Sequence, residues 1–232
     1  MLNRLVGMWS GNRDHATPPP QGAVPPAAEP AARPAAKAPS VMRREAMLGR
    51  DQKVAAYTFM LRRAPDEQRD RALPDMQRLY DETLLGNLQR MEIARLLGQR
   101  LAFVPVVPAS LSIPLIDSWP AAGTVWVLKI DSQTPIDDSL LARMAELKTR
   151  GSGFALHADM AMRPERHALL QLADYVLMDV GSEDIPAITA QMAAVSKVAA
   201  GKRFVATEVQ TLEAFHMCHK LQFALFMGPF IT

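Results

Sequence analysis

The pattern of hydrophobic and polar residues alternates between two types along residues 41–232. Short, continuously apolar runs are typical of strands buried on both faces, and apolar residues spaced three or four positions apart are typical of helices. The predicted strands cover residues 53–63, 101–107, 124–131, 153–157, 174–180, 202–209 and 222–231. The predicted helices cover residues 72–100, 136–151, 163–173, 182–201 and 211–221.

Strand and helix follow one another about six times after the first strand, which indicates a mostly parallel sheet covered by helices. This many units in so short a chain favour a closed TIM-type α/β barrel over an open sheet. Thr211 is predicted to open the last helix. In the helix over residues 72–100, the apolar residues recur at about three and four positions: Met76, Leu79, Tyr80, Leu84, Leu88, Met91, Leu96 and Leu97.

Residues 1–40 have a different pattern. Eight of the chain's 18 prolines fall between residues 15 and 40, mixed with alanine, which predicts an extended linker and no packed core. The sequence therefore divides into a disordered N-terminal segment with a Pro/Ala-rich linker, residues 1–40, and one folded domain, residues 41–232. The first 14 residues contain Leu2, Leu5 and Trp9 around Arg4. They form either a loose terminus or a small amphipathic segment that docks on a partner or a membrane surface.

Composition narrows the classes of function. Hydrophobic residues make up 49% of the chain and charged residues 22%, and the net charge of +2 does not favour a nucleic-acid partner. No apolar run is long enough for a transmembrane segment. The single cysteine, Cys218, excludes an internal disulfide and predicts a reducing, cytoplasmic location. His216 and His219 lie beside it in sequence, and we interpret them as partly exposed helix residues without a metal.

The strand over residues 153–157 ends at His157, and Asp159 follows two positions later. In a barrel of parallel strands, catalytic side chains lie at the carboxyl ends of the strands. His157 and Asp159 are therefore candidates for a catalytic or metal site.

Five segments of the chain carry a family resemblance. The first is "LGRDQKVAAYTFMLRR", and it is followed by "VWVLKID", "RGSGFALHADM", "LADYVLMDV" and "FVATEVQTLEAFHMCHKLQFALFMGPF". In this order they resemble the EAL domain, the cyclic di-GMP phosphodiesterase family of bacterial signal transduction, whose first strand the first segment matches. They are most similar to the EAL halves of EAL–HDOD proteins. The resemblance covers residues 41–230 and implies a TIM-type barrel of EAL type.

The resemblance also implies where the family's metal ligands would fall. The glutamate that names the family falls at Thr58, and the asparagine after the next strand falls at Pro105. The first glutamate of the E-x-x-E stretch falls at Leu128, although its acidic end remains as Asp131. The two aspartates of D-D-F-G fall at His157 and Ala158.

The remaining functional positions are changed as well. The catalytic lysine of K-x-D falls at Leu177, although Asp179 remains. The two glutamates of A-E-x-V-E fall at Thr207 and Gln210, and the glutamine before the terminal Gly-aromatic pair falls at Met227. Shifting the alignment by one residue would restore Asp159 or Glu208, but not the other ligands.

Hard divalent cations need clustered oxygen ligands, and proline, leucine and alanine side chains supply none. We therefore expect a catalytically inactive, degenerate EAL-like regulatory protein with no cofactor, which acts through protein–protein interaction with an unidentified partner. The first alternative is a receptor that binds cyclic di-GMP without hydrolysing it. The second is an enzyme with altered chemistry around His157, Asp159 and Asp131.

Arg62 bears on the first alternative. It retains the family's strand-end arginine, which contacts a phosphate of the nucleotide, and a guanidinium can hold a phosphate with two hydrogen bonds. The simpler interpretation, which we prefer, is a solvated or ion-paired charge at the rim of the barrel.

Overall fold

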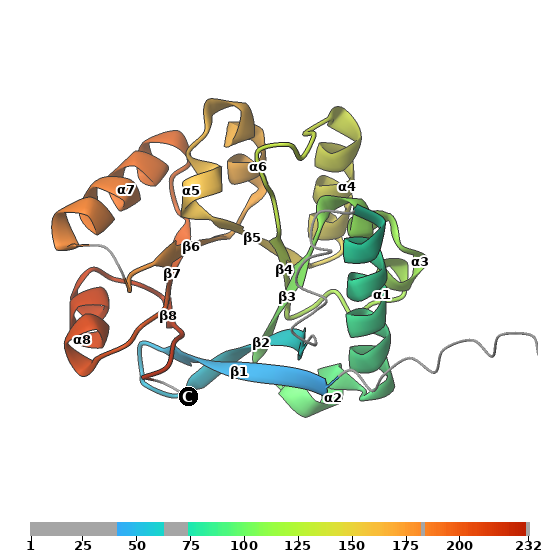
Figure 1. Ribbon diagram of the computed structural model, residues 1–232, viewed down its shortest axis with the longest axis horizontal. Helices are drawn as coiled ribbons and strands as arrows, with labels where there is room; N and C mark the ends of the chain where they lie inside the picture. The colour runs from blue at the N-terminus through green and yellow to red at the C-terminus, as the bar shows by residue number, and fades with distance from the viewer. Residues whose placement is uncertain (1–40, 63–73, 182–183, 231–232) are drawn as a thin grey trace, which may run out of the picture. The chain divides into compact units, whose positions relative to one another are not determined.

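The computed structural model describes residues 41–62, 74–181 and 184–230, so the predicted N-terminal segment lies outside the described residues. In this part of the chain eight strands form a closed barrel in sequence order, which confirms the predicted fold class (Figure 1). The strands are β1 (Val41–Gly49), β2 (Val54–Arg62), β3 (Leu101–Val106), β4 (Thr124–Leu128), β5 (Gly153–His157), β6 (Tyr175–Asp179), β7 (Arg203–Thr207) and β8 (Leu225–Phe226).

β1 is a strand that the apolar pattern did not predict. It runs antiparallel to β2, from Val41 opposite Arg62 to Leu48 opposite Val54, and antiparallel to β8 on its other side. The strands from β2 to β8 are parallel to one another. β1 carries charged residues among its apolar ones, so its strand character depends on pairing with two neighbours and not on an apolar run.

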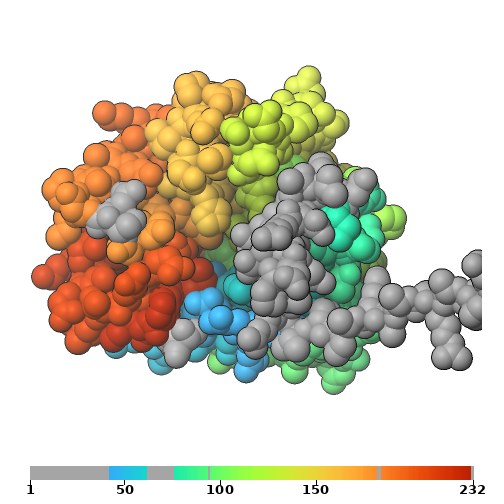
Figure 2. Space-filling view, in the orientation of Figure 1, coloured from blue at the N-terminus to red at the C-terminus, as the bar shows by residue number. Residues whose placement is uncertain are grey.

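Helices surround the barrel on the outside (Figure 1), and Figure 2 shows the same face with all atoms drawn. They are α1 (Pro74–Arg90), α2 (Ile93–Leu97), α3 (Pro114–Asp117), α4 (Asp138–Thr149), α5 (Ala158–Ala161), α6 (His167–Leu172), α7 (Ile185–Val198) and α8 (Leu212–Lys220), with short 3-10 helices η2 (Pro108–Ser112) and η3 (Pro164–Arg166). The Thr211 side chain accepts a hydrogen bond from the Ala214 amide at the start of α8, which confirms the predicted helix start. Asp137 and Asp184 cap α4 and α7 in the same way.

The single helix predicted over residues 72–100 is wrong. Glu92 adopts a left-handed conformation with φ of 49°, which ends α1 and starts the short α2. Four of the apolar residues with helical spacing are exposed: Met76, Leu79, Met91 and Leu96. The buried face of α1 is formed by Asp81, Leu84, Leu85 and Leu88, a stripe with helical spacing that excludes positions 76 and 79.

The last predicted strand, residues 222–231, is also much shorter than expected, because β8 contains only two residues. Beyond it the chain continues alongside the end of β7 through two backbone hydrogen bonds, from Val209 N to Met227 O and from Phe230 N to Val209 O. Gly228 has φ of +154°, and a Cβ atom there would lie 2.3 Å from Val209 N. Glycine is required at this close approach.

The strands bury two separate sets of side chains. In β4, Val125 and Val127 point into the barrel, while Trp126 and Leu128 pack outward under the helices. The same alternation places Phe103, Ala155, Tyr175 and Val205 in the interior. No helix in the described parts of the chain is both long and apolar enough to span a membrane.

Candidate functional site

The mouth of the barrel lies at the carboxyl ends of β2–β8. Every second side chain along a strand faces the barrel interior. Counting on from the interior core, this alternation brings Thr58, Pro105, His157 and Met227 to the mouth, above Leu177. Thr58 and Leu177 are buried. The inward-facing positions at this end also include Asp179 and Thr207, so the mouth combines apolar and polar side chains.

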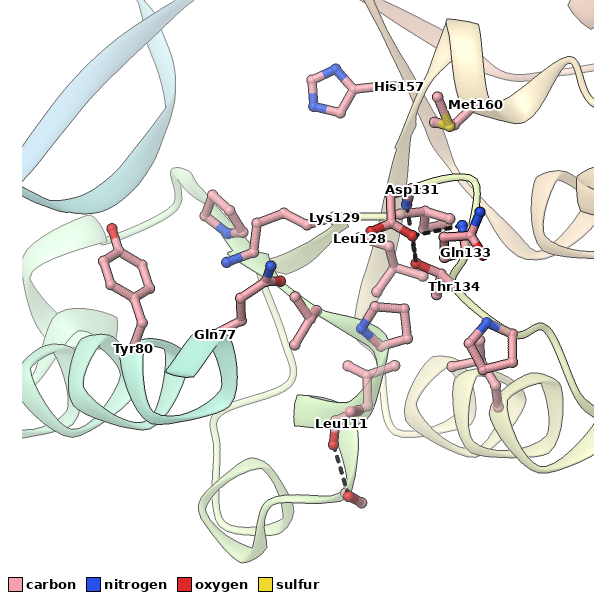
Figure 3. A pocket seen from close by; sticks show the side chains of 18 of the residues that line it. Gln77, Tyr80, Leu111, Leu128, Lys129, Asp131, Gln133, Thr134, His157 and Met160 are labelled. Carbon is pink, nitrogen blue, oxygen red and sulfur yellow. Dashed lines mark hydrogen bonds between the residues drawn. The ribbon is translucent and has the colours of Figure 1, made fainter. Parts of the chain in front are cut away.

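A cavity of about 1690 Å³ opens beside the mouth, over the ends of β2, β3 and β4 and against α1, η2 and α4 (Figure 3). Five of the positions singled out from the sequence line it: Pro105, Leu128, Asp131, His157 and Asp159. Leu128 reaches it from the outer face of β4, where it packs in the outer core. The ligand position assigned to Leu128 thus does not face the barrel interior.

A buried carboxylate fixes one wall of the cavity. Asp81 of α1 is fully buried and accepts hydrogen bonds from Val107 N at 2.7 Å and Ser110 Oγ at 2.8 Å, and from Lys129 Nζ at 2.7 Å. Lys129 also lies over the Tyr80 ring, with Nζ 5.2 Å from the ring centroid. In Figure 3 the Lys129 side chain extends from the end of β4 toward α1. This pairing joins α1, β4 and the residues after β3.

Arg143 of α4 is the second cation that lines the cavity. Its Nη1 contacts Glu146 Oε2 at 2.7 Å and its Nη2 pairs with Asp117, while Nε donates to Leu111 O at 3.0 Å. Both cations in the described lining are therefore already paired with carboxylates.

Asp131 stabilises the loop between β4 and α4. Its Oδ1 accepts hydrogen bonds from Thr134 Oγ1 at 2.7 Å and Gln133 N at 2.9 Å, as the dashed lines in Figure 3 show. Hydrogen bonds from the Thr134 hydroxyl and from the backbone amides of Gln133 and Thr134 lower the pKa of Asp131. The buried Arg166 holds the same loop, because its guanidinium donates to the backbone carbonyls of Thr134 and Asp131.

His157 ends β5 at the mouth of the barrel and is accessible to solvent. The surrounding protein nevertheless displaces enough water to lower the pKa of His157, and the nearby charges of Asp159 and Asp179 oppose that shift. Ala158, the next residue, is buried at the start of α5. The structure thus brings His157, Asp159 and Asp131 to one cavity, with Asp131 already committed to its loop.

The positions on β6 and β7 form a separate part of the mouth. Thr207 is buried, and its hydroxyl donates to Met178 O at 3.1 Å, which is a hydrogen bond between β7 and β6. Asp179 accepts a hydrogen bond from Gly181 N at 2.9 Å. Glu208 adopts a left-handed conformation with φ of 58°. None of Asp179, Thr207 and Gln210 is among the described residues that line the cavity.

Arg62 is the last residue of β2, and its side chain lies outside what the structure describes, so its predicted phosphate contact stays a prediction. On α8, Cys218 is buried, which raises its pKa to about 11, while His216 is exposed. In the described parts of the chain no group of three or more His, Cys, Asp or Glu side chains is placed to hold a metal ion.

Sequence reasoning missed three residues that shape this site: Asp81, Lys129 and Arg143. Asp81 carried a usable signal, because it lies three and seven positions before Leu84 and Leu88 and so occupies the buried stripe of its helix. A charge at such a position indicates a buried partner. Lys129 and Arg143 had no comparable signal.

Solved structures share this fold at low sequence identity. The Bacillus subtilis YkuI protein, with an EAL domain, in complex with cyclic di-GMP and calcium, has a TM-score of 0.64 and 14% identity over 82% of this chain and 53% of YkuI. The PaMucR phosphodiesterase, in complex with cyclic di-GMP, has a TM-score of 0.62 and 14% identity over 81% of this chain and 93% of its own. An EAL domain protein from Listeria monocytogenes EGD-e has a TM-score of 0.59 and 13% identity over 83% of this chain and 87% of its own.

These likenesses establish that the fold is an EAL-type TIM barrel, as the sequence resemblance implied. The chain spans about half the length of YkuI. No model of a known protein family matches the sequence, and no curated protein matches it.

Proposed function

We propose that this chain is a non-catalytic regulatory protein that uses an EAL-type barrel to bind another protein. The observation that carries the proposal is the chemistry of the inward positions at the strand ends, where Pro105, Leu177 and Met227 stand. None of these side chains supplies an oxygen ligand for a divalent cation.

Two threonines in the same region do not replace the missing oxygen ligands. Thr58 and Thr207 are buried, and the Thr207 hydroxyl is bonded to Met178 O. Of the acidic residues nearby, Asp131 holds its own loop and Asp179 accepts from the Gly181 amide. The residues present therefore do not fit a pair of hard cations, which need several clustered carboxylates to activate water.

Catalysis is tested by incubating the full chain with cyclic di-GMP and Mg²⁺ or Mn²⁺ and following the linear product by chromatography. We expect no product above that of a heat-denatured control. Any turnover above that control would contradict the proposal, and turnover that disappears in His157→Ala would favour the altered chemistry around His157, Asp159 and Asp131.

Partner binding is tested by affinity purification of the tagged full chain from cells that naturally make it, followed by mass spectrometry. We expect at least one protein to be enriched over a tag-only control at near-stoichiometric yield. Failure to enrich any protein would contradict a role in protein–protein interaction.

The second candidate function is binding of cyclic di-GMP without cleavage. The observation that favours it is the cavity beside the strand ends, which is large and is lined by Lys129 and Arg143. YkuI and PaMucR were each solved in complex with cyclic di-GMP. Calorimetric titration with and without Mg²⁺ distinguishes the candidates: micromolar binding that is lost in Arg62→Ala would favour the receptor.

A further inference from the structure

The cavity beside the barrel mouth has walls suited to apolar side chains. Met60, Pro105, Pro108, Ile130 and Met160 line it and are all partly exposed, so apolar surface there is reachable from solvent. Met60 belongs to β2 and Met160 to α5, so they approach the cavity from two elements. Methionine side chains are flexible and adapt to the shape of an inserted side chain. The volume of about 1690 Å³ exceeds the roughly 1,000 Å³ at the upper end of pockets for single small ligands.

The charges around the cavity are unequal. Among the described residues that line it, the two cations, Lys129 and Arg143, are both in ion pairs. The three carboxylates, Asp131, Asp137 and Asp159, are exposed and take part in none of the ion pairs that the described residues form. Among the described residues, the charge at the rim that no ion pair balances is therefore negative.

This imbalance decides between classes of occupant. A phosphodiester would meet described cations that are already neutralised, and it would be repelled by the carboxylates that no ion pair balances. A segment carrying lysine or arginine would be attracted by the same carboxylates, and its apolar side chains would fill the cavity. The negative rim and the apolar walls therefore both favour a peptide segment with basic and apolar residues.

We propose that the cavity beside the barrel mouth binds a peptide segment of a partner protein in which apolar residues are flanked by lysine or arginine. This rests on the proposed function and adds to it the place and chemistry of the contact. Apolar anchors occupy the space between Met60, Pro105 and Met160, while basic residues face Asp131, Asp137 and Asp159.

The site is tested by photo-cross-linking in cells that naturally make the protein. Benzoylphenylalanine replaces Ala109, an exposed residue of η2 that lines the cavity, in the full-length chain. The matched control replaces Ala122, an exposed alanine in the turn before β4, at the opposite end of the barrel. The cross-linked segment is identified by mass spectrometry and then synthesised as a fluorescent peptide for anisotropy measurements.

We expect cross-links at Ala109 and not at Ala122, to a segment with apolar residues and net positive charge. The synthetic peptide should bind the native chain, and Ala109→Trp should weaken binding at least about tenfold by filling the cavity, whereas Ala122→Trp should not. Asp159→Lys should weaken it about fivefold at low salt. Glu165→Lys, at an exposed acid that does not line the cavity, should have little effect.

Several results would overturn the proposal. An acidic or wholly polar segment at Ala109, a cross-link to a second copy of this chain, or displacement of the peptide by micromolar cyclic di-GMP each contradicts its chemistry. Cross-links only at Ala122, or none while affinity purification still yields a partner, remove the cavity as the site and leave the proposed function standing. No partner by either method removes both.

Discussion

Asp81 is the residue on which the geometry of the cavity wall depends most directly. Its buried carboxylate accepts hydrogen bonds from Val107 N, Ser110 Oγ and Lys129 Nζ. We expect Asp81→Ala to lower the free energy of unfolding by about 2–4 kcal/mol, because Lys129 loses its partner and the Val107 amide is left unpaired. Urea denaturation followed by circular dichroism measures this loss.

The adjacent residue provides the control for that prediction. Glu82 pairs with Arg78 at 3.2 Å on the exposed side of the same helix. Glu82→Ala should cost less than about 1 kcal/mol, because solvent screens an exposed ion pair. Similar losses in both variants would show that Asp81 has no special role in holding the wall.

His157 gives a prediction about pH. Its pKa is lowered, mainly because the protein displaces water from the imidazole. As pH falls below about 6.5, the unfolded chain takes up this proton before the folded chain does, so stability should decrease. An NMR titration should place the midpoint of His157 below 6.5, and His157→Gln should remove this part of the acid sensitivity. A midpoint above 6.5 would contradict the desolvated environment.

At the scale of elements, the closure of β8 against the end of β7 depends on Gly228. A Cβ atom at this position would lie 2.3 Å from Val209 N and 2.5 Å from Val209 O, and backbone atoms cannot give way as a flexible side chain does. We expect Gly228→Ala to lower the free energy of unfolding by at least about 2 kcal/mol. Thermal unfolding followed by circular dichroism would measure it.

Gly86 in the middle of α1 is the matched glycine for that experiment. A Cβ atom there would meet only the end of the Arg90 side chain, at 3.9 Å. Gly86→Ala should raise the free energy of unfolding by about 1 kcal/mol, because alanine favours the helix. If both alanine variants shifted stability in the same direction, the close approach at Gly228 would not be the deciding contact.

The element scale also shows where sequence periodicity misled. Residues 72–100 have apolar residues spaced closely enough for one long helix, yet Glu92 breaks it and Leu96 is 58% exposed. The spacing of apolar residues indicates which of them share a face of a helix. It does not indicate how much of that face packs against the barrel. The core face of α1 follows Asp81 and Leu84, a stripe that includes a charge.

At the scale of the whole molecule, the barrel depends on β1 for closure. All eight strands lie within residues 41–226, so a variant that begins at Pro39 should keep the midpoint and slope of urea denaturation. A variant that begins at Asp51 lacks β1 and leaves the edges of β2 and β8 unpaired, so it should not unfold cooperatively. Loss of cooperativity in the longer variant would contradict the domain boundary predicted at residue 41.

The sequence by itself determined the alternation of strand and helix, the closed barrel and the caps such as Thr211, because local periodicity and capping chemistry follow from neighbouring residues. It also located the strand-end positions, from Pro105 to Met227, whose side chains supply few oxygens. Only the tertiary structure decided the pairing of β1, the outward direction of Leu128 and the pairing of Asp81 with Lys129 across 48 positions. These features depend on strand register and on charges that meet only once the barrel closes, and no local pattern encodes either.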